Sequence, residues 1–286
     1  MFRQFFLPFT VVGMTGFLTA CSAMKDVGPD DYLDKAKAYV KTQQFQSAKL
    51  YVDSVKILFP KDFDKIKEGL SIMREVNMEE QKRTLAFCDS MLKVRQNELP
   101  VVAKDFTFQK DVQYESIGHY VPKSQLSDNN IGRTYLQSKV DEKGRLVLTS
   151  YYSGPRAINH TRVKAIVGNG YFAESLNVPQ DGALNYAFKD GGKQYEIVRL
   201  TNKSENGLVD FILLHKDSRV NIELFGDRNY SYVLSQPDKK ALKASTDLSA
   251  ILTDINRLLS EIRLAQAKLD YLYSKQHGKS PEDSIR

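Results

Sequence analysis

Residues 248–272 read LSAILTDINRLLSEIRLAQAKLDYL, and their apolar side chains recur in alternating steps of three and four. The positions of this seam are Leu248, Ile251, Ile255, Leu258, Ile262, Ala265, Leu269 and Leu272. Such steps are typical of a helix whose a and d positions face a partner helix. The sequence therefore predicts a coiled-coil helix over residues 237–277, followed by a polar tail over residues 278–286.

A candidate partner helix lies between Pro60 and Pro100, where 39 residues contain no proline and one glycine. Met78, Leu85, Leu92 and Leu99 recur every seven residues, and Phe63, Ile66, Leu70 and Met73 form a second stripe. Polar residues 74–84 separate the stripes, and either a helix break or a coiled-coil stutter explains the change of phase. We expect the two long helices to pair antiparallel within one chain. A parallel homodimer through the carboxy-terminal heptads is the alternative.

Residues 30–60 have the pattern of a helical hairpin. Asp30 or Asp31 can cap a helix that reaches about Thr42, and a second helix runs from Phe45 to Phe59 before Pro60 ends it. The segment resembles one unit of a tetratricopeptide repeat in the spacing of Tyr32, Ala36, Tyr39, Ala48, Val52, Val55 and Pro60. The next residues do not repeat this pattern, so we expect a single tetratricopeptide-like hairpin within a helical region over residues 30–100.

Residues 101–236 have the alternation of antiparallel sheet. Strands are predicted around Val209, Phe211 and Leu213, around Val220, Ile222 and Leu224, and around Tyr230, Tyr232 and Leu234. Turn sequences lie at residues 141–144, 168–170, 190–192, 205–207 and 226–229. About ten strands at this spacing are typical of a β-sandwich or a closed barrel. The predicted fold class is α+β, with an antiparallel β-sandwich-like domain inserted between the long helix and the coiled-coil helix.

The amino terminus carries the pattern of a secretory signal. Arg3 precedes an apolar segment from Phe5 to Leu18, which is too short for a membrane span of about 20 residues. Leu18-Thr19-Ala20-Cys21 resembles the lipobox of bacterial lipoproteins. The resemblance implies that residues 1–20 are a signal peptide and that lipidated Cys21 anchors the chain to a membrane. A plain signal peptide or an amino-terminal transmembrane anchor is the alternative.

The residues after Cys21 bear on location. Residues 21–29 read as a short tether, and Ser22 stands where aspartate would retain a lipoprotein in the inner membrane of enterobacteria. By that analogy we expect the outer membrane of a cell envelope. Lys25-Asp26 resembles half of a surface-export signal of the Bacteroidetes, so the periplasmic and the surface face both stay open.

Composition limits the partners and the redox chemistry. The net charge of +6 is spread along the chain without a basic run, so we expect no nucleic-acid partner. With Cys21 lipidated, Cys88 is the remaining cysteine and no internal disulfide can form. Cys88 falls on an apolar helical stripe and is predicted to be a buried small side chain.

No stretch of the sequence predicts catalytic residues, a cofactor or a metal. The four histidines are never within four residues of each other, and there is no phosphate-binding glycine loop, nucleophile elbow or Cys/His pair. One polar segment, with Arg156, Asn159, His160 and Arg162, could face a glycan or an anion. A solvated loop is the alternative.

Tyrosines are the second candidate for ligand binding. The β region holds Tyr114, Tyr120, Tyr135, Tyr151, Tyr152, Tyr171, Tyr186, Tyr195, Tyr230 and Tyr232. On an exposed face, interleaved with Arg133, Arg156 and Arg162, tyrosines could stack on sugar rings. Tyrosine is also a common strand residue, and the chain has no tryptophan.

The order of lipobox, helical part, β domain around Ile158-Asn159-His160-Thr161 and coiled-coil helix resembles uncharacterised lipoproteins of the Bacteroidales. That resemblance implies no activity. Asp53-Ser54-Val55, Asp89-Ser90-Met91 and Asp283-Ser284-Ile285 resemble the O-glycosylation pattern of Bacteroidetes proteins, with Ser284 in the polar tail the expected site.

From these features we expect a non-enzymatic interaction or scaffold protein of the cell envelope, bound to the membrane through Cys21 and to an unknown protein or glycan. A glycan-binding accessory lipoprotein of a polysaccharide uptake system is the alternative. A hydrolase is the third hypothesis.

Overall fold

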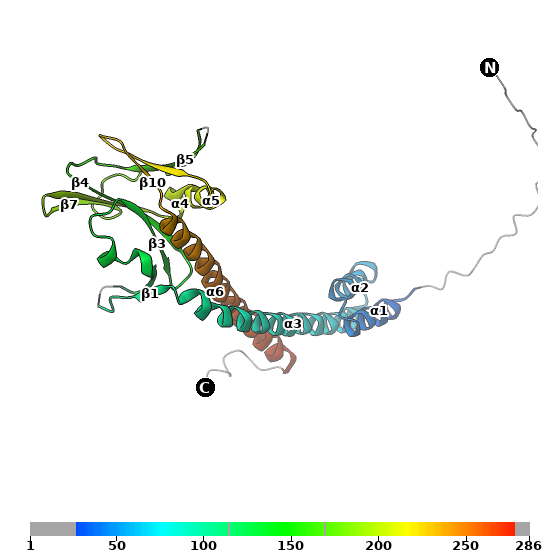
Figure 1. Cartoon of the computed structure of the whole chain (residues 1–286). Coiled ribbons are helices and arrows are strands. Elements are labelled where there is room, and N and C mark those ends of the chain that lie inside the picture. Colours follow the sequence, from blue (N-terminus) through cyan, green and yellow to red (C-terminus); the bar gives the residue numbers. More distant parts are fainter. Residues whose placement is uncertain (1–26, 114, 169, 278–286) are drawn as a thin grey trace, which may run out of the picture. The chain divides into compact units, whose positions relative to one another are not determined.

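The computed structural model describes residues 27–113, 115–168 and 170–277. The signal peptide, Cys21, the tail with Ser284 and Tyr114 lie outside the described residues. The described chain divides into two compact units, one ending at Glu80 and one beginning at Gln81, whose elements are labelled in Figure 1. Across the described ranges, no helix combines the length and the apolar character needed to cross a membrane.

The first unit contains the predicted helical hairpin. It consists of α1 (Pro29–Lys41), α2 (Phe45–Leu58) and the part of α3 (Phe63–Ala103) that precedes Gln81. Ala36 and Ala48 are completely buried, which allows α1 and α2 to pack closely. The first helix begins at Pro29, where a missing N–H costs no helical hydrogen bond. The N-cap is Gly28 rather than the predicted Asp30 or Asp31, and Asp31 lies inside the first turn, where it accepts a hydrogen bond from the Gly28 N–H at 2.9 Å.

The apolar stripe predicted from Phe63 onward does not form the buried face of the helix. Phe63 is 76% exposed and Leu70 is 53% exposed, whereas Ile72 and Val76 are buried against the hairpin. Gly69 decides which side of α3 faces inward, because a Cβ atom there would lie 3.2 Å from Cγ1 of Val52. The small residue, rather than the large apolar ones, therefore marks the close contact.

The long helix α3 runs without interruption across the polar residues 74–84, so the helix break is excluded there. The boundary between the two compact units falls inside this polar stretch. The prediction that the helix stops before Pro100 is wrong, because α3 continues to Ala103. Pro100 is exposed and about one turn from the helix end, where water can replace the lost backbone hydrogen bond.

The second unit contains two antiparallel sheets. The six-stranded sheet has the order β1 (Phe106–Gln109), β2 (His119–Pro122), β3 (Tyr135–Asp141), β4 (Leu146–Gly154), β8 (Lys193–Leu200) and β7 (Asn185–Asp190). The four-stranded sheet has the order β10 (Tyr230–Val233), β9 (Val220–Phe225), β5 (Arg162–Val167) and β6 (Tyr171–Glu174). Two 3-10 turns, η1 (Lys123–Gln125) and η2 (Ser127–Asn129), lie between β2 and β3.

The two sheets share one hydrophobic core, which confirms the sandwich-like prediction. Leu148 and Val198 of the six-stranded sheet belong to the same buried cluster as Val163 and Ile222 of the four-stranded sheet. The turns predicted at residues 141–144, 190–192 and 226–229 connect neighbouring antiparallel strands, as does the turn that includes Gly168 and Gly170.

The strand predicted around Val209 is wrong, since these residues form α5 (Leu208–Leu214). Leu208, Val209 and Ile212 are buried, and their spacing fits one face of a helix. The turn predicted at residues 205–207 connects two helices, α4 (Asn202–Glu205) and α5, and not two strands of a hairpin. Asn206 and Gly207 have left-handed φ angles of 53° and 79° there.

Within the second unit, residues 81–103 of α3 pair antiparallel with α6 (Gln236–His277). Cys88 Sγ lies 3.5 Å from Glu261 Oε2, and an Arg95 nitrogen lies 2.8 Å from Asp254 Oδ2. Moving seven residues forward on α3 corresponds to moving seven back on α6, which defines the antiparallel register. Leu248 and Leu258 of the seam are 0% and 1% exposed.

The inner face of the six-stranded sheet is covered by two different elements. The four-stranded sheet covers the part formed by β4 and β8, through the shared core. The amino-terminal half of α6 covers the part formed by β3, where Ser138 and Ser245 hydroxyls lie 2.8 Å apart and Val140 packs with Leu248. The opposite, outer face carries no helix or second sheet among the described residues, and it holds the candidate site.

Candidate functional site

The outer face of the six-stranded sheet is built from odd-numbered residues of its central strands, because strand side chains alternate between faces. Gln137 of β3 lies opposite Thr149 of β4, which lies opposite Arg199 of β8. In the neighbouring row Tyr135, Tyr151, Ile197 and Tyr186 follow each other across β3, β4, β8 and β7. A polar row therefore borders an aromatic row.

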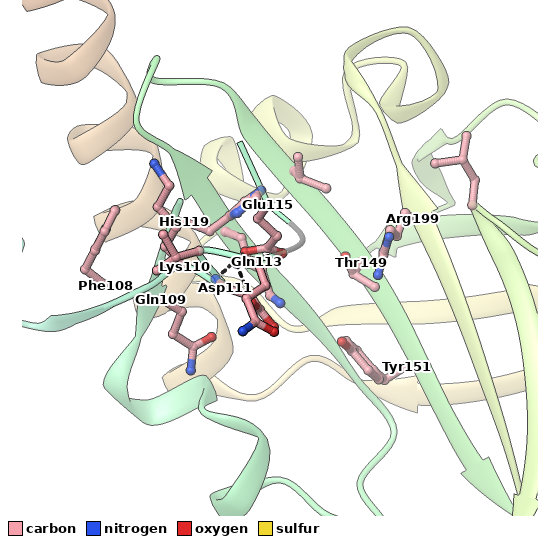
Figure 2. A pocket seen from close by; sticks show the side chains of 14 residues that line it. Phe108, Gln109, Lys110, Asp111, Gln113, Glu115, His119, Thr149, Tyr151 and Arg199 are labelled. Atoms are coloured by element: carbon pink, nitrogen blue, oxygen red, sulfur yellow. Dashed lines mark hydrogen bonds between the residues drawn. The ribbon is translucent and has the colours of Figure 1, made fainter. Parts of the chain in front are cut away.

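A pocket of about 1080 Å³ lies over the polar row, as Figure 2 shows. Lys139, Thr149, Tyr151 and Arg199 line it from the sheet, and residues 108–113, Glu115 and His119 line it from the segment between β1 and β2. Pockets of this size accommodate a small ligand of several rings.

The side chains of Lys139 and Arg199 in this pocket have no ion-pair partner among the described residues. Lys139 is half-buried, and burial followed by the charge of Arg199 lowers the pKa of its amine, while Glu115 acts in the opposite direction. The two acidic side chains of the rim each accept a backbone hydrogen bond. The Gln113 N–H donates to Asp111 Oδ1 at 3.0 Å, and the Asp111 N–H donates to Glu115 Oε2 at 3.2 Å.

A second hollow of about 310 Å³ adjoins the first, and Tyr151 lines both. Its walls include the aromatic residues Tyr135, Phe188 and Tyr195 together with polar residues such as Asn130 and Asp190. The rings of Tyr135 and Tyr151 are stacked with centroids 5.0 Å apart, and those of Phe188 and Tyr195 are stacked at the same distance. We call the two hollows together the outer-face cleft.

A glutamine side chain holds the edge of β3 beside this cleft. The Gln125 Nε2 group donates to the Leu136 carbonyl at 2.8 Å, and Gln125 Oε1 accepts from the Ser138 N–H at 2.9 Å. The amide therefore occupies the place of a backbone peptide group in a neighbouring strand. Gln137, which donates to the Gln125 carbonyl, is fixed in turn.

The structure does not bring the predicted polar segment together as one surface. The His160 side chain is 0% exposed, so it lies inside the protein and neither faces a ligand nor belongs to a solvated loop. Asn159, at a left-handed φ of 53°, bonds through Nδ2 to Asp227 at 2.8 Å. Arg162 pairs with Glu174 and lies over the Phe225 ring.

Arg156 is the one member of that segment that lines a hollow. This shallow hollow of about 520 Å³ also includes Lys189, Gln194 and Arg228. The Arg156 backbone carbonyl accepts a hydrogen bond from the Tyr152 hydroxyl at 2.9 Å. Its charged head is on an exposed rim, unlike the half-buried Lys139 of the outer-face cleft.

His160 belongs to a buried chain of three side chains that resembles a hydrolase triad in its distances. Ser150 Oγ lies 3.1 Å from His160 Nε2, and His160 Nδ1 lies 2.7 Å from Glu196 Oε2. Ser150, His160 and Glu196 are at most 1% exposed, so no substrate reaches the hydroxyl in this conformation. A catalytic serine needs an accessible hydroxyl and an oxyanion site beside it.

Glu196 has a structural role in this chain. It accepts the backbone N–H groups of Ile158, Asn159 and His160 at 2.7, 2.8 and 2.9 Å. Burial raises the pKa of the Glu196 carboxyl, but the hydrogen bonds from His160 and from the backbone outweigh burial and lower it overall. The ionised carboxylate thus holds the bend before β5.

The tyrosines of the β region divide between two roles. Tyr135, Tyr151, Tyr186 and Tyr195 lie on the outer face, beside Arg133 and Arg199. Tyr152 is 4% exposed, and burial raises the pKa of the Tyr232 hydroxyl well above its usual value. Tyr135 is 3% exposed and is therefore buried like Tyr152, whereas Tyr151, Tyr186 and Tyr195 keep exposed ring surface on the outer face.

The remaining reactive residues point to no metal or thiol chemistry within the part of the chain that is described. No group of three or more His, Cys, Asp or Glu side chains converges there. Cys88 is completely buried, and burial, with Glu261 beside it, raises the pKa of its thiol. Ser54 and Ser90 lie in α2 and α3.

Sequence reasoning missed Lys139 and Arg199. The signal that could have found them is a charge that interrupts an apolar strand, at the fifth residue of YLQSKV (135–140) and the fourth of EIVRL (196–200). In comparisons with protein-family models, curated proteins and solved structures, none matches this chain. The geometry of the outer-face cleft is therefore the basis for the functional argument.

Proposed function

We propose that this protein is a lipid-anchored, non-enzymatic binding protein of the cell envelope. In this proposal Cys21 attaches the chain to the membrane, and the outer-face cleft of the six-stranded sheet receives the partner. The observation that carries the proposal is the cleft itself, where Lys139, Tyr151 and Arg199 of the central strands remain partly or fully exposed. Central strands are rigid supports, which favours binding without reorganisation.

The lipobox-like sequence Leu18-Thr19-Ala20-Cys21 supports the membrane location. Two or three acyl chains on one cysteine are sufficient for stable anchoring, since each buried methylene contributes about 0.8 kcal/mol. The proposed compartment is the outer membrane, on either face.

The glycan-binding alternative is favoured by a specific observation. Tyr151, Phe188 and Tyr195 have exposed surface on one face next to hydrogen-bonding groups, as sugar-binding surfaces require. The hydrolase hypothesis gains no support from Ser150, His160 and Glu196, because all three are withdrawn from solvent.

Two variants test the proposal in native membranes. Cys21→Ser is expected to move the protein from the membrane to the soluble fraction, and continued membrane attachment would refute the anchor. Arg199→Trp fills the pocket and is expected to remove the partner captured by chemical cross-linking and affinity purification. Lys164→Trp, on β5 of the other sheet, is the matched control and should retain that partner.

A further inference from the structure

The charges of the outer-face cleft are arranged for an anion. Lys139 of β3 lies opposite Val147 of β4, and Arg199 of β8 lies opposite Thr149, two residues further along β4. Neither forms an ion pair within the described ranges, although the rim of the same pocket carries two carboxylates. Half-burying an ammonium group next to another cation costs free energy. Such a cost is typical of sites where the charge serves binding.

The aromatic side of the cleft selects a ring-shaped ligand. Tyr151 separates the cationic pocket from the hollow formed with Tyr135 and Tyr195, so one ligand can contact both. Tyr186 lies beside the cations, with its ring centroid 5.9 Å from the Arg199 guanidinium carbon. Tyrosine faces pack against sugar rings and keep a hydroxyl for hydrogen bonding.

Hydrogen-bonding groups lie between the charges and the rings. Thr149, which is 3% exposed, lines the pocket floor. Gln137 is buried, and its Oε1 accepts a hydrogen bond from the Tyr151 hydroxyl at 3.3 Å, so it positions Tyr151. Together the cleft offers two cations, a hydroxyl and ring faces over three neighbouring rows of the sheet.

We propose that the outer-face cleft binds an acidic saccharide, with a ring carboxylate at Lys139 and Arg199 and the sugar rings against Tyr151 and Tyr195. This inference rests on the proposed binding function and names its ligand class. The combined hollows, of about 1080 and 310 Å³, suit an oligosaccharide better than a single sugar.

The test is calorimetric titration of the full mature lipoprotein in detergent. Tri-galacturonate and tri-mannuronate are the acidic probes, and galactotriose and mannotriose are their neutral counterparts. We expect at least one acidic trisaccharide to bind at least tenfold more tightly than its neutral counterpart. Equal affinity for the two kinds, or no binding of either acidic probe, overturns the proposal.

Variants locate the site. Lys139→Met and Arg199→Met are each expected to weaken acidic-saccharide binding at least tenfold, and Tyr151→Ala to weaken it similarly. Lys164→Met, which removes a lysine from the other sheet, should change affinity less than twofold. Circular dichroism establishes that each variant is folded. Unchanged affinity in Lys139→Met and Arg199→Met overturns the assignment.

The outcomes separate this inference from the proposed function. If no acidic saccharide binds while Arg199→Trp still removes the partner captured in native membranes, the ligand class is wrong and the binding function stands. If no acidic saccharide binds and the Arg199→Trp variant captures the partner as the native chain does, both the ligand class and the proposed function are wrong.

Discussion

His160 Nδ1 lies 2.7 Å from Glu196 Oε2, and both side chains are withdrawn from solvent. Glu196 also accepts three backbone N–H groups. Glu196→Gln removes the charge and presents an amide N–H to a donor, so we expect a loss of about 3 kcal/mol in the free energy of unfolding. Urea unfolding followed by near-ultraviolet circular dichroism measures it. Glu174→Gln, at a surface pair with Arg162, should cost less than about 1 kcal/mol.

The same carboxylate predicts an acid-dependent stability. Its pKa in the folded protein is lowered below the usual value of 4.5, so its contribution is present above pH 4.5 and is lost as the pH falls through the folded pKa. The difference in unfolding free energy between the native protein and Glu196→Gln should therefore shrink on acidification below that pH. A constant difference throughout the acid range would contradict the structural role of the ionised carboxylate.

Ser150 should be inert towards serine-hydrolase reagents. Its hydroxyl lies 3.1 Å from His160 Nε2, but both side chains are 0% exposed. We expect no labelling of the native protein by a fluorophosphonate probe under conditions that label an active serine hydrolase. Ser150→Ala should lower stability by about 1 kcal/mol, because His160 loses a hydrogen-bond partner. Labelling that disappears in Ser150→Ala would instead revive the hydrolase hypothesis.

Periodicity was sufficient to predict the helical hairpin, the two long helices, the α+β class and the strands around Ile222 and Tyr232. It failed for residues 208–214, where alternate apolar residues suggested a strand but consecutive ones, Leu208 and Val209, are buried as on a helix. A seven-residue segment is too short for the two periods to be distinguished. It also failed at Gly69, because a pattern of large apolar residues does not reveal a close helix contact that depends on glycine having no side chain.

The candidate site was less predictable than the fold. His160 was singled out by the polar residues beside it in sequence, yet its partners Ser150 and Glu196 come from other strands. Lys139 and Arg199 are 60 positions apart and meet because β4 pairs with both β3 and β8. Strand order in a sheet depends on long-range pairing, which local sequence patterns do not contain.

The pairing of α3 with α6 predicts how the coiled-coil seam responds to truncation. Leu258 is 1% exposed and Leu259 is 41% exposed, although they are neighbours in the sequence. Leu258→Ala should lower the free energy of unfolding by about 3 kcal/mol because it leaves a cavity, whereas Leu259→Ala should cost less than about 1 kcal/mol. Equal effects of the two substitutions would refute this register.

Concentration dependence distinguishes the intramolecular pairing from the homodimer. If α3 and α6 of one chain cover the seam, the melting temperature is independent of protein concentration, whereas a dimer formed through Leu258 melts at higher temperature as concentration rises. The measurement uses the mature protein in detergent over a hundredfold range of concentration.

The lowered pKa of Lys139 predicts a pH profile for acidic-saccharide binding. Burial and Arg199 lower it from 10.5, and Glu115 opposes them; Lys110, Asp111 and His119 also line the pocket. As the pH rises through this lowered pKa, the ammonium loses its charge while the sugar carboxylate stays ionised. The affinity should therefore begin to decrease at a pH lower than 10.5. Lys139→Arg keeps its charge throughout and should bind with nearly constant affinity over the same range. If the native protein and Lys139→Arg show the same profile, the Lys139 amine does not contact the ligand carboxylate.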